Sequence, residues 1–207
     1  VEGSHLLVAT GRVPNTDGLG LEAMGLEAGP RGHIATNGRL ETAIEGVWAL
    51  GDINGRGAFT HTSYHDFEIV SDNLAGGDRS ADTRVMAYAM FTDPPLGHVG
   101  LHRHEAQKLA DEGRNILIAE HDMKDVSRAK EESELAGRIR IIVDGDSGMV
   151  LGATVLGING DEIIQTFVNF MAAGGHWRAM RNALPVHPTV TEFMPTILDK
   201  LIPLKGN

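Results

Sequence analysis

A tight turn between two apolar segments constrains the fold of this chain more than any other feature. Residues 138–143 and 150–156 each predict a strand, and the segment Asp-Gly-Asp-Ser-Gly at 144–148 lies between them. Glycine supplies the positive φ that a hairpin turn requires, so the two strands are expected to pair antiparallel. Further strands are predicted at 86–91 and 116–120, which places an antiparallel sheet in the second half of the chain.

Helices are expected beside this sheet. Apolar residues at helical spacing indicate helices over 101–112 and 161–173, and a final helix is predicted from Pro188 to about Leu201. The helix over 161–173 has apolar residues on more than one face, so we expect burial from two sides, as a subunit interface would provide. The second half is therefore predicted to be an α+β unit.

The first 83 residues have a different pattern, with strands punctuated by glycine. Apolar runs predict strands at 5–9 and 46–52, and a helix is expected over 60–75. Residues 76–80, Gly-Gly-Asp-Arg-Ser, are the best candidate for a linker. We therefore expect two domains, covering 1–83 and 84–207.

Composition excludes several classes of function. The 207 residues have a formal net charge of -10 and a pI of about 5.4, so the chain lacks the basic surface that nucleic acid needs. No apolar run approaches the roughly 20 residues of a membrane span, and no leader pattern opens the chain, which predicts a soluble cytoplasmic protein. There is no cysteine, and hence no disulfide, thiolate metal site or cysteine nucleophile in these residues. Because the chain opens on Val1 and enters an apolar run at once, we expect that an upstream portion has been removed.

Two short segments of the first domain are candidates for ligand binding. Asp52 follows Gly51 at the end of a predicted strand, where a carboxylate can accept hydrogen bonds from ligand hydroxyls, although Gly-Asp pairs are also common in turns. The helix expected from Thr60 would have unpaired N–H groups and a partial positive charge at its N-terminus, which could face a ligand. His61 and His65 share a helix face, but no acidic partner completes a metal site, so none is predicted.

A candidate acid/base pair lies near the C-terminus. Pro188 favours extended geometry for His187, which would project just ahead of the final helix. Glu192, one turn into that helix, could reach back to the imidazole, fix its tautomer and stabilise the imidazolium. The alternative is a capping arrangement with an incidental histidine. The charged residues at 130–134 are expected to be solvated surface.

Five segments, in a fixed order, give the sequence a family resemblance. They are Ala-Thr-Gly-Arg-Val-Pro-Asn at 9–15, Gly-Val-Trp-Ala-Leu-Gly-Asp at 46–52 followed by Phe-Thr-His-Thr-Ser at 59–63, Phe-Thr-Asp-Pro-Pro-Leu-Gly-His-Val-Gly at 91–100, Leu-Gly-Ala-Thr at 151–154 with Gly157 and Glu162, and His-Pro-Thr-Val-Thr-Glu at 187–192. Together they resemble the pyridine nucleotide-disulfide oxidoreductases, the family of dihydrolipoamide dehydrogenase, glutathione reductase and mercuric reductase. The resemblance covers essentially the whole chain.

The resemblance implies a fold and a set of site residues. Residues 84–207 would be the dimerisation domain, preceded at 1–83 by the end of the NAD(P) domain and the C-terminal part of the FAD domain. His187 and Glu192 would serve as acid/base for redox thiols of the opposite subunit. The cofactor residues implied for FAD and NAD(P)H are Gly51, Asp52, Thr60, His61, Pro188, Gly11 and Ala89, with the carbonyl of Ala89 and Gly11 near the nicotinamide nucleotide. His61 departs from the proline that is common at its position.

The implied activity is hydride transfer from NAD(P)H to FAD, then to a cysteine pair and on to a substrate, in a homodimer. The glycine-rich FAD fingerprint and the cysteine pair are not in these residues, so the chain alone is expected to be inactive. The segment at 187–198 most resembles proteins labelled mercuric reductase-like, but the C-terminal cysteine pair that collects Hg(II) is absent. The sequence therefore favours dihydrolipoamide dehydrogenase-like or general disulfide reductase activity as much as mercuric reductase-like activity. A different kind of function is also considered: the chain could be a non-catalytic dimerisation or interaction module.

Overall fold

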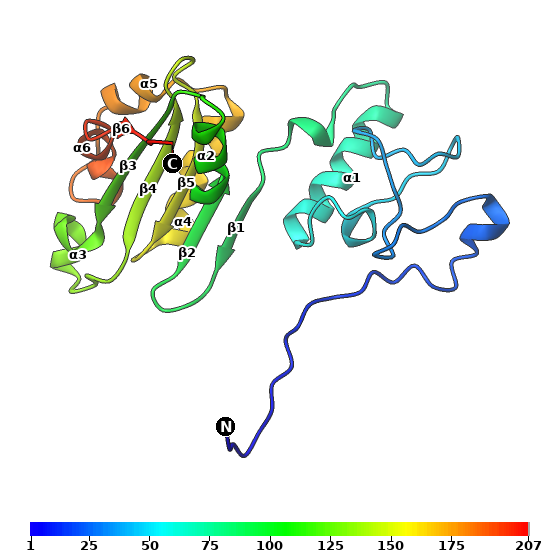
Figure 1. The fold of residues 1–207 in the computed structure, drawn as a ribbon. Coiled ribbons are helices and arrows are strands. Elements are labelled where there is room, and N and C mark those ends of the chain that lie inside the picture. The colour runs from blue at the N-terminus through cyan, green and yellow to red at the C-terminus, as the bar shows by residue number, and fades with distance from the viewer. Residues whose placement is uncertain (207) are drawn as a thin grey trace. The chain divides into compact units, whose positions relative to one another are not determined.

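The computed structural model describes residues 1–206, and the chain divides into two compact units after Arg84. The first unit is Val1–Arg84, and the second begins at Val85. Figure 1 shows the elements of each unit along the chain. None of the helices in the described residues is long and apolar enough to cross a membrane.

A six-stranded antiparallel sheet organises the second unit, in the order β1-β2-β5-β4-β3-β6. Its strands are β1 (Ala87–Met90), β2 (Leu96–Gly100), β3 (Ile116–Asp122), β4 (Arg138–Asp144), β5 (Val150–Leu156) and β6 (Ile202–Pro203). The predicted hairpin is confirmed, because β4 and β5 pair antiparallel, with Ile141 opposite Ala153. The sequence did not predict β2 and β6 as strands.

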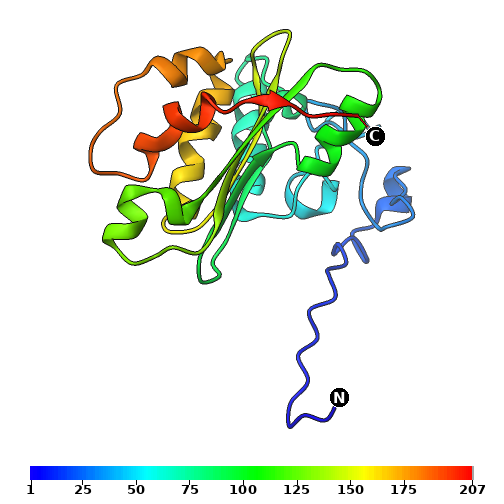
Figure 2. The ribbon, with the colours of Figure 1, turned by 60° about the vertical axis from the view of Figure 1, so that its left-hand side comes forward.

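Helices cover both faces of this sheet (Figures 1 and 2). They are α2 (Arg103–Asp111), α3 (Ser127–Glu131), α4 (Gly160–Ala172), α5 (Trp177–Asn182) and α6 (Met194–Leu198). Strand residues alternate between the faces: Ile141 belongs to the core shared with α4 and α6, and Ile142 packs with α2. The α+β class predicted for this unit is confirmed.

Helix α4 packs one apolar face against its own chain. Ile163, Ile164 and Phe167 are buried in the main core, and Phe170 and Met171 pack partly buried against the same core. The sheet and the neighbouring helices therefore cover the face of α4 that carries the three buried residues.

The final helix does not begin at Pro188, contrary to the prediction. A 3-10 turn, η5, spans Thr191–Phe193 and leads into α6. The hydroxyl Oγ1 of Thr189 accepts a hydrogen bond from the Glu192 N–H at 3.1 Å and donates one to the Val186 carbonyl at 2.7 Å. These side-chain bonds compete with helical hydrogen bonds and hold residues 186–190 in a loop.

The first unit is built around one helix, α1 (Thr60–Leu74), which confirms the predicted helix. Shorter 3-10 turns are η1 (Leu21–Met24), η2 (Gly51–Asn54) and η3 (Ala81–Thr83). The strand predicted at 46–52 is reduced to one isolated bridge, between Trp48 and Glu41. Residues 5–9 form no strand, because no other segment within residues 1–206 pairs with them, and a lone strand leaves its backbone groups unpaired.

Candidate functional site

A surface hollow of about 680 Å³ lies in the first unit, beside the head of α1. It is lined by Arg12, Asp52, Ala58, Phe59, Thr60, Ser63, Tyr64 and Phe67. The guanidinium of Arg12 lies 3.8 Å from the carboxylate of Asp52, and both side chains are well exposed. Two predicted cofactor residues, Asp52 and Thr60, thus line one hollow.

The hollow combines an acceptor with a positive helix end. Asp52 presents a carboxylate, which accepts hydrogen bonds from hydroxyl groups. The first N–H groups of an α-helix have no intrahelical acceptor and carry partial positive charge, so the head of α1 favours an electron-rich ligand atom. Thr62 holds that head in place, because its Oγ1 accepts from the Phe59 N–H at 3.1 Å and donates to the Phe59 carbonyl at 2.7 Å.

The other residues predicted for this site lie around the hollow. Gly51 is buried next to Asp52, and Gly11 precedes Arg12 in the chain with φ of 118°. His61 is not among the lining residues; its ring stacks on that of Phe59, with centroids 5.2 Å apart. Sequence reasoning missed the aromatic wall formed by Phe59, Tyr64 and Phe67. Its signal was three large aromatic residues at nearly helical spacing in a helix otherwise rich in polar residues.

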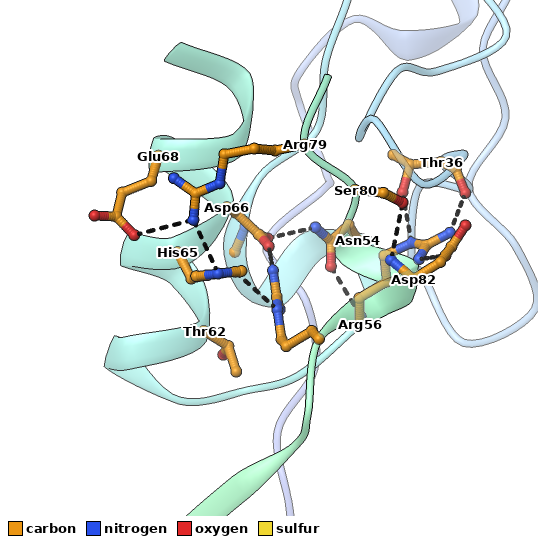
Figure 3. Close-up of polar contacts among 12 residues, drawn as sticks. Thr36, Asn54, Arg56, Thr62, His65, Asp66, Glu68, Arg79, Ser80 and Asp82 are labelled. Atoms are coloured by element: carbon orange, nitrogen blue, oxygen red, sulfur yellow. Dashed lines mark hydrogen bonds and ion pairs between the residues drawn. The ribbon is translucent and has the colours of Figure 1, made fainter. Parts of the chain in front are cut away.

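A buried polar network joins α1 to the turn at Gly51–Asn54 (Figure 3). Asp66 of α1 is 1% exposed and accepts hydrogen bonds from the Gly51 N–H at 2.9 Å and from Asn54 Nδ2 at 2.7 Å. Its second oxygen forms an ion pair with Arg84. No local pattern predicts this network, because its members are 12 to 18 residues apart in the chain.

His65 sits between two arginines of the same unit. Its Nδ1 accepts from Arg84 Nε at 3.1 Å, and its Nε2 lies 3.2 Å from Arg79 Nη2. Burial, followed by the charge of Arg84, lowers the pKa of His65. The ring of His65 thus contacts the two arginines, whereas the ring of His61 stacks on Phe59.

The predicted acid/base pair is formed in the second unit. His187 Nδ1 lies 2.8 Å from Glu192 Oε2. The side chain of His187 is 76% exposed, whereas that of Glu192 is 12% exposed. The histidine is therefore oriented by a largely buried carboxylate and presents its other nitrogen to the surroundings.

The segment that carries Glu192 rests on β3. Phe193 packs against His121, with ring centroids 5.6 Å apart, and His121 Nδ1 lies 3.1 Å from Lys200 Nζ. Burial, with a contribution from Lys200, lowers the pKa of His121, so its ring is neutral. Among the described residues no partner bonds the buried Nε2 of His121. Of the remaining predicted residues, Pro188 follows His187, and Ala89 pairs with Gly97 in the sheet.

Two models of known protein families match the chain. A family model described as "Pyridine nucleotide-disulphide oxidoreductase, dimerisation domain" matches residues 86–197. The chain belongs to this family. A second model, "Pyridine nucleotide-disulphide oxidoreductase", matches residues 1–66. The resemblance inferred from the five sequence segments is thus confirmed, and members of the family use FAD and NAD(P)H.

Individual relatives support the same assignment. The probable pyridine nucleotide-disulfide oxidoreductase RclA of Escherichia coli is 34% identical over 189 residues, which cover 90% of this chain and 42% of that protein. Dihydrolipoyl dehydrogenase of Synechocystis is 32% identical, over 91% of this chain and 41% of the relative. The chain therefore spans about two fifths of the length of these relatives.

Solved structures show the same fold. RclA from Escherichia coli, described as an HOCl-induced flavoprotein disulfide reductase, superposes with a TM-score of 0.82 at 31% identity, over 92% of this chain and 44% of that one. LpdA from Mycobacterium tuberculosis gives a TM-score of 0.86 at 25% identity, over 96% of this chain and 43% of that one.

Proposed function

We propose that this chain is the C-terminal part of an FAD-dependent oxidoreductase that uses NAD(P)H to reduce a cysteine pair and, through it, a disulfide substrate. The observation that carries the proposal is the contact of 2.8 Å between His187 Nδ1 and Glu192 Oε2. A histidine oriented by a carboxylate suits proton transfer to and from thiols. The chain contains no cysteine, so the thiols would come from other residues.

The proton chemistry follows from the orientation of the imidazole. A carboxylate accepts hydrogen bonds only, so Glu192 selects the tautomer of His187 that has its proton on Nδ1. The exposed Nε2 then carries the lone pair, takes a proton from a thiol and returns it to a leaving thiolate. Glu192 stabilises the imidazolium that forms in between.

The hollow beside α1 fits part of a flavin cofactor. Asp52 would accept hydrogen bonds from the hydroxyls of the ribityl chain, and Thr60 would present the head of α1 to the isoalloxazine ring. His61, the next residue of α1, is assigned to the same contact although it does not line the hollow. Gly51, with φ of 74° and no side chain, lets the backbone approach the helix. When bound, FAD would supply two-electron chemistry between NAD(P)H and the thiols.

The remaining cofactor assignments extend this proposal. Gly11 and the backbone carbonyl of Ala89 would contact the nicotinamide nucleotide, and Pro188 would contact FAD beside His187. We further propose that residues 1–83 contribute to the NAD(P) and FAD domains and that residues 84–207 form the dimer interface, in a cytoplasmic homodimer in which His187 serves the partner's thiols. The matching dimerisation model at 86–197 supports the homodimer.

The disulfide class of substrate is preferred over a metal ion. RclA is described as a disulfide reductase, and other relatives are dihydrolipoyl dehydrogenases. One RclA structure is described as a Cu(II) complex. In this chain the residues near the C-terminus include no thiol that could collect a soft ion such as Hg(II). Lipoamide and other disulfides are therefore the first substrates to test.

The test uses the intact protein, purified with its flavin. NADH and NADPH oxidation would be followed with lipoamide, a small aromatic disulfide and Hg(II) as acceptors. We expect turnover with a disulfide, and loss of that turnover in His187→Gln but not in His104→Gln, which changes an exposed histidine of α2. Turnover with Hg(II) alone would favour the mercuric reductase-like alternative. A protein that binds no FAD and oxidises no NAD(P)H would favour the non-catalytic module.

A further inference from the structure

Asp66 is a buried acid that the proposed reaction does not use. It lies in α1, is 1% exposed, and has three donors: the Gly51 N–H, the Asn54 amide and the Arg84 guanidinium. A buried carboxylate without partners would be costly, so these three contacts define where Asp66 can lie. Figure 3 shows Asp66 directed from α1 toward Asn54.

One oxygen of Asp66 closes the turn that carries Asp52. Oδ2 accepts from the Gly51 N–H at 2.9 Å and from Asn54 Nδ2 at 2.7 Å, so it binds both the first and the last residue of η2. Asn54 Nδ2 also donates to the Ala49 carbonyl at 3.1 Å, which ties the turn to the preceding segment. Asp52 lies within this turn and therefore has little freedom to move along α1.

The same helix supplies the opposite wall of the hollow. Thr60, Ser63 and Phe67 line it, and Asp66 lies six residues, about 9 Å, along α1 from its first residue. A Cβ atom on Gly51 would lie 2.7 Å from Ser63 Oγ, which shows how closely the turn approaches the helix. Asp66 thus links the turn that carries Asp52 to the helix that carries Thr60.

Arg84 compensates the charge of Asp66. The Arg84 side chain is 8% exposed, pairs with Oδ1 of Asp66 and donates from Nε to His65. Each oxygen of the carboxylate therefore has its own donors, and neither is left for a ligand. Asp66 therefore acts through Gly51, Asn54 and Arg84 rather than through direct contact with a ligand.

We propose that Asp66 is a positioning residue for the flavin contact: it holds Asp52 and the head of α1 at the separation that one ligand requires. The inference rests on the proposed function, because it assigns the hollow to FAD. A carboxylate that served stability alone would not change the spectrum or the affinity of a bound flavin once the protein is folded.

The experiment compares Asp66→Asn with wild type in the intact FAD-containing protein. The amide of asparagine presents an N–H₂ group where one oxygen accepted, so at least one of its donors loses its acceptor. The matched control is Asp78→Asn, which removes an exposed Asp–Arg pair, with Arg39, from the same unit. The measurements are the dissociation constant of FAD, its visible absorption maxima, and the urea midpoint of the apoprotein.

We expect Asp66→Asn to lower the urea midpoint relative to the control, because the buried Arg84 loses its ion-pair partner. Without urea, where the apoprotein is still folded, we expect it to bind FAD about tenfold more weakly and to shift the visible bands of FAD. Asn54→Ala, which removes one of the three donors, should change FAD binding in the same direction by less. If Asp66→Asn fails to fold, Asn54→Ala decides the question alone.

Three results distinguish the outcomes. A wild-type protein that binds no FAD refutes the proposed function and the inference with it. The inference is overturned if a folded Asp66→Asn protein keeps the FAD affinity and spectrum of wild type. If Asp66→Asn does not fold, the same result in Asn54→Ala overturns it. In both cases the proposed function stands. Weaker FAD binding with an unchanged flavin spectrum, found only under conditions in which the apoprotein is partly unfolded, assigns Asp66 to general stability and also overturns the inference.

Discussion

His187 and Glu192 meet at 2.8 Å between Nδ1 and Oε2, within a loop that Thr189 holds out of helical geometry. The carboxylate is largely buried and the imidazole is exposed, so the pair orients one free nitrogen toward the surroundings. The separation of five residues is bridged by the 3-10 turn at Thr191–Phe193, not by an α-helix that starts at Pro188.

Replacing either member of this pair should slow only the thiol step. In the intact protein we expect His187→Ala to reduce disulfide-dependent turnover by about 100-fold, because general acid/base catalysis contributes on that order. Glu192→Gln should reduce it by about tenfold, because the amide no longer stabilises the imidazolium. Stopped-flow measurement of flavin reduction by NAD(P)H should be unchanged in both variants. Equal slowing of flavin reduction would refute the assignment of the pair to the thiol step.

Lowering the pH should destabilise the second unit over a pH range that is set by the pKa of His98. This ring is 2% exposed, Nε2 bonds the Gly100 carbonyl at 3.0 Å and Nδ1 bonds Thr154 Oγ1 at 2.9 Å. Burial lowers the pKa of His98, although the bond to Gly100 opposes the shift. The unfolded chain therefore takes up a proton near its ordinary pKa of about 6.5, while the folded chain resists it.

The stability that His98 contributes is thus present above about pH 6.5 and is lost as the pH falls from there toward its lowered pKa, at up to about 1.4 kcal/mol per pH unit. Urea unfolding of the chain between about pH 7.5 and pH 5 would measure it. His98→Gln should flatten the dependence, and His104→Gln, at an exposed site, should leave it unchanged. An equal slope in all three proteins would contradict the prediction.

The close approach of β2 to α4 predicts that Gly97 cannot be enlarged. A Cβ atom on Gly97 would lie 2.3 Å from the Gly160 carbonyl oxygen and 2.6 Å from Ile164 Cβ. We expect Gly97→Ala to lower the free energy of unfolding by about 1–3 kcal/mol, because backbone must move to admit the methyl group. Gly206→Ala, at an exposed position where the nearest atom would be 3.3 Å away, should change it little. Urea midpoints of the two variants give the comparison.

The β4–β5 hairpin depends on Asp144. Its Oδ1 accepts from the Ser147 N–H at 2.8 Å, from Ser147 Oγ at 2.9 Å and from the Asp146 N–H at 3.2 Å, and Arg114 pairs with the other oxygen. The bond from the Ser147 N–H, chiefly, lowers the pKa of Asp144, so its contribution is present above about pH 4 and is lost as the pH falls toward the lowered pKa.

Asp144→Asn should therefore cost about 1–3 kcal/mol at neutral pH and lose less further stability on acidification below pH of about 4. Asp146→Asn, in the same turn but at an exposed position, is the control. Equal urea midpoints for the two variants at neutral pH would show that the bonds to Asp144 do not hold the turn.

Local patterns predicted much of the second unit. The turn at 144–148, the strands on either side and the helices near 101–112 and 161–173 all form, because side-chain periodicity and glycine act over a few residues. The order of five short segments was enough to identify the family, and the spacing of His187 and Glu192 was enough to predict their contact.

Other features depend on contacts between residues that are distant in the chain. Residues 5–9 are apolar enough for a strand but have no partner in the described chain, and Pro188 stays outside a helix because Thr189 and Glu192 bond each other instead. The buried residues of α4 pack against the chain's own sheet, a contact that periodicity alone does not specify.

The sequence by itself therefore determined the family, the hairpin and the contact between His187 and Glu192, because each is carried by residues close together in the chain. Only the tertiary structure decided that Asp66 is buried against Gly51, Asn54 and Arg84. A lone aspartate in a polar helix looks like solvated surface in the sequence. Its burial is set by which distant donors the fold brings to it, since a carboxylate leaves water only where such donors replace its hydration.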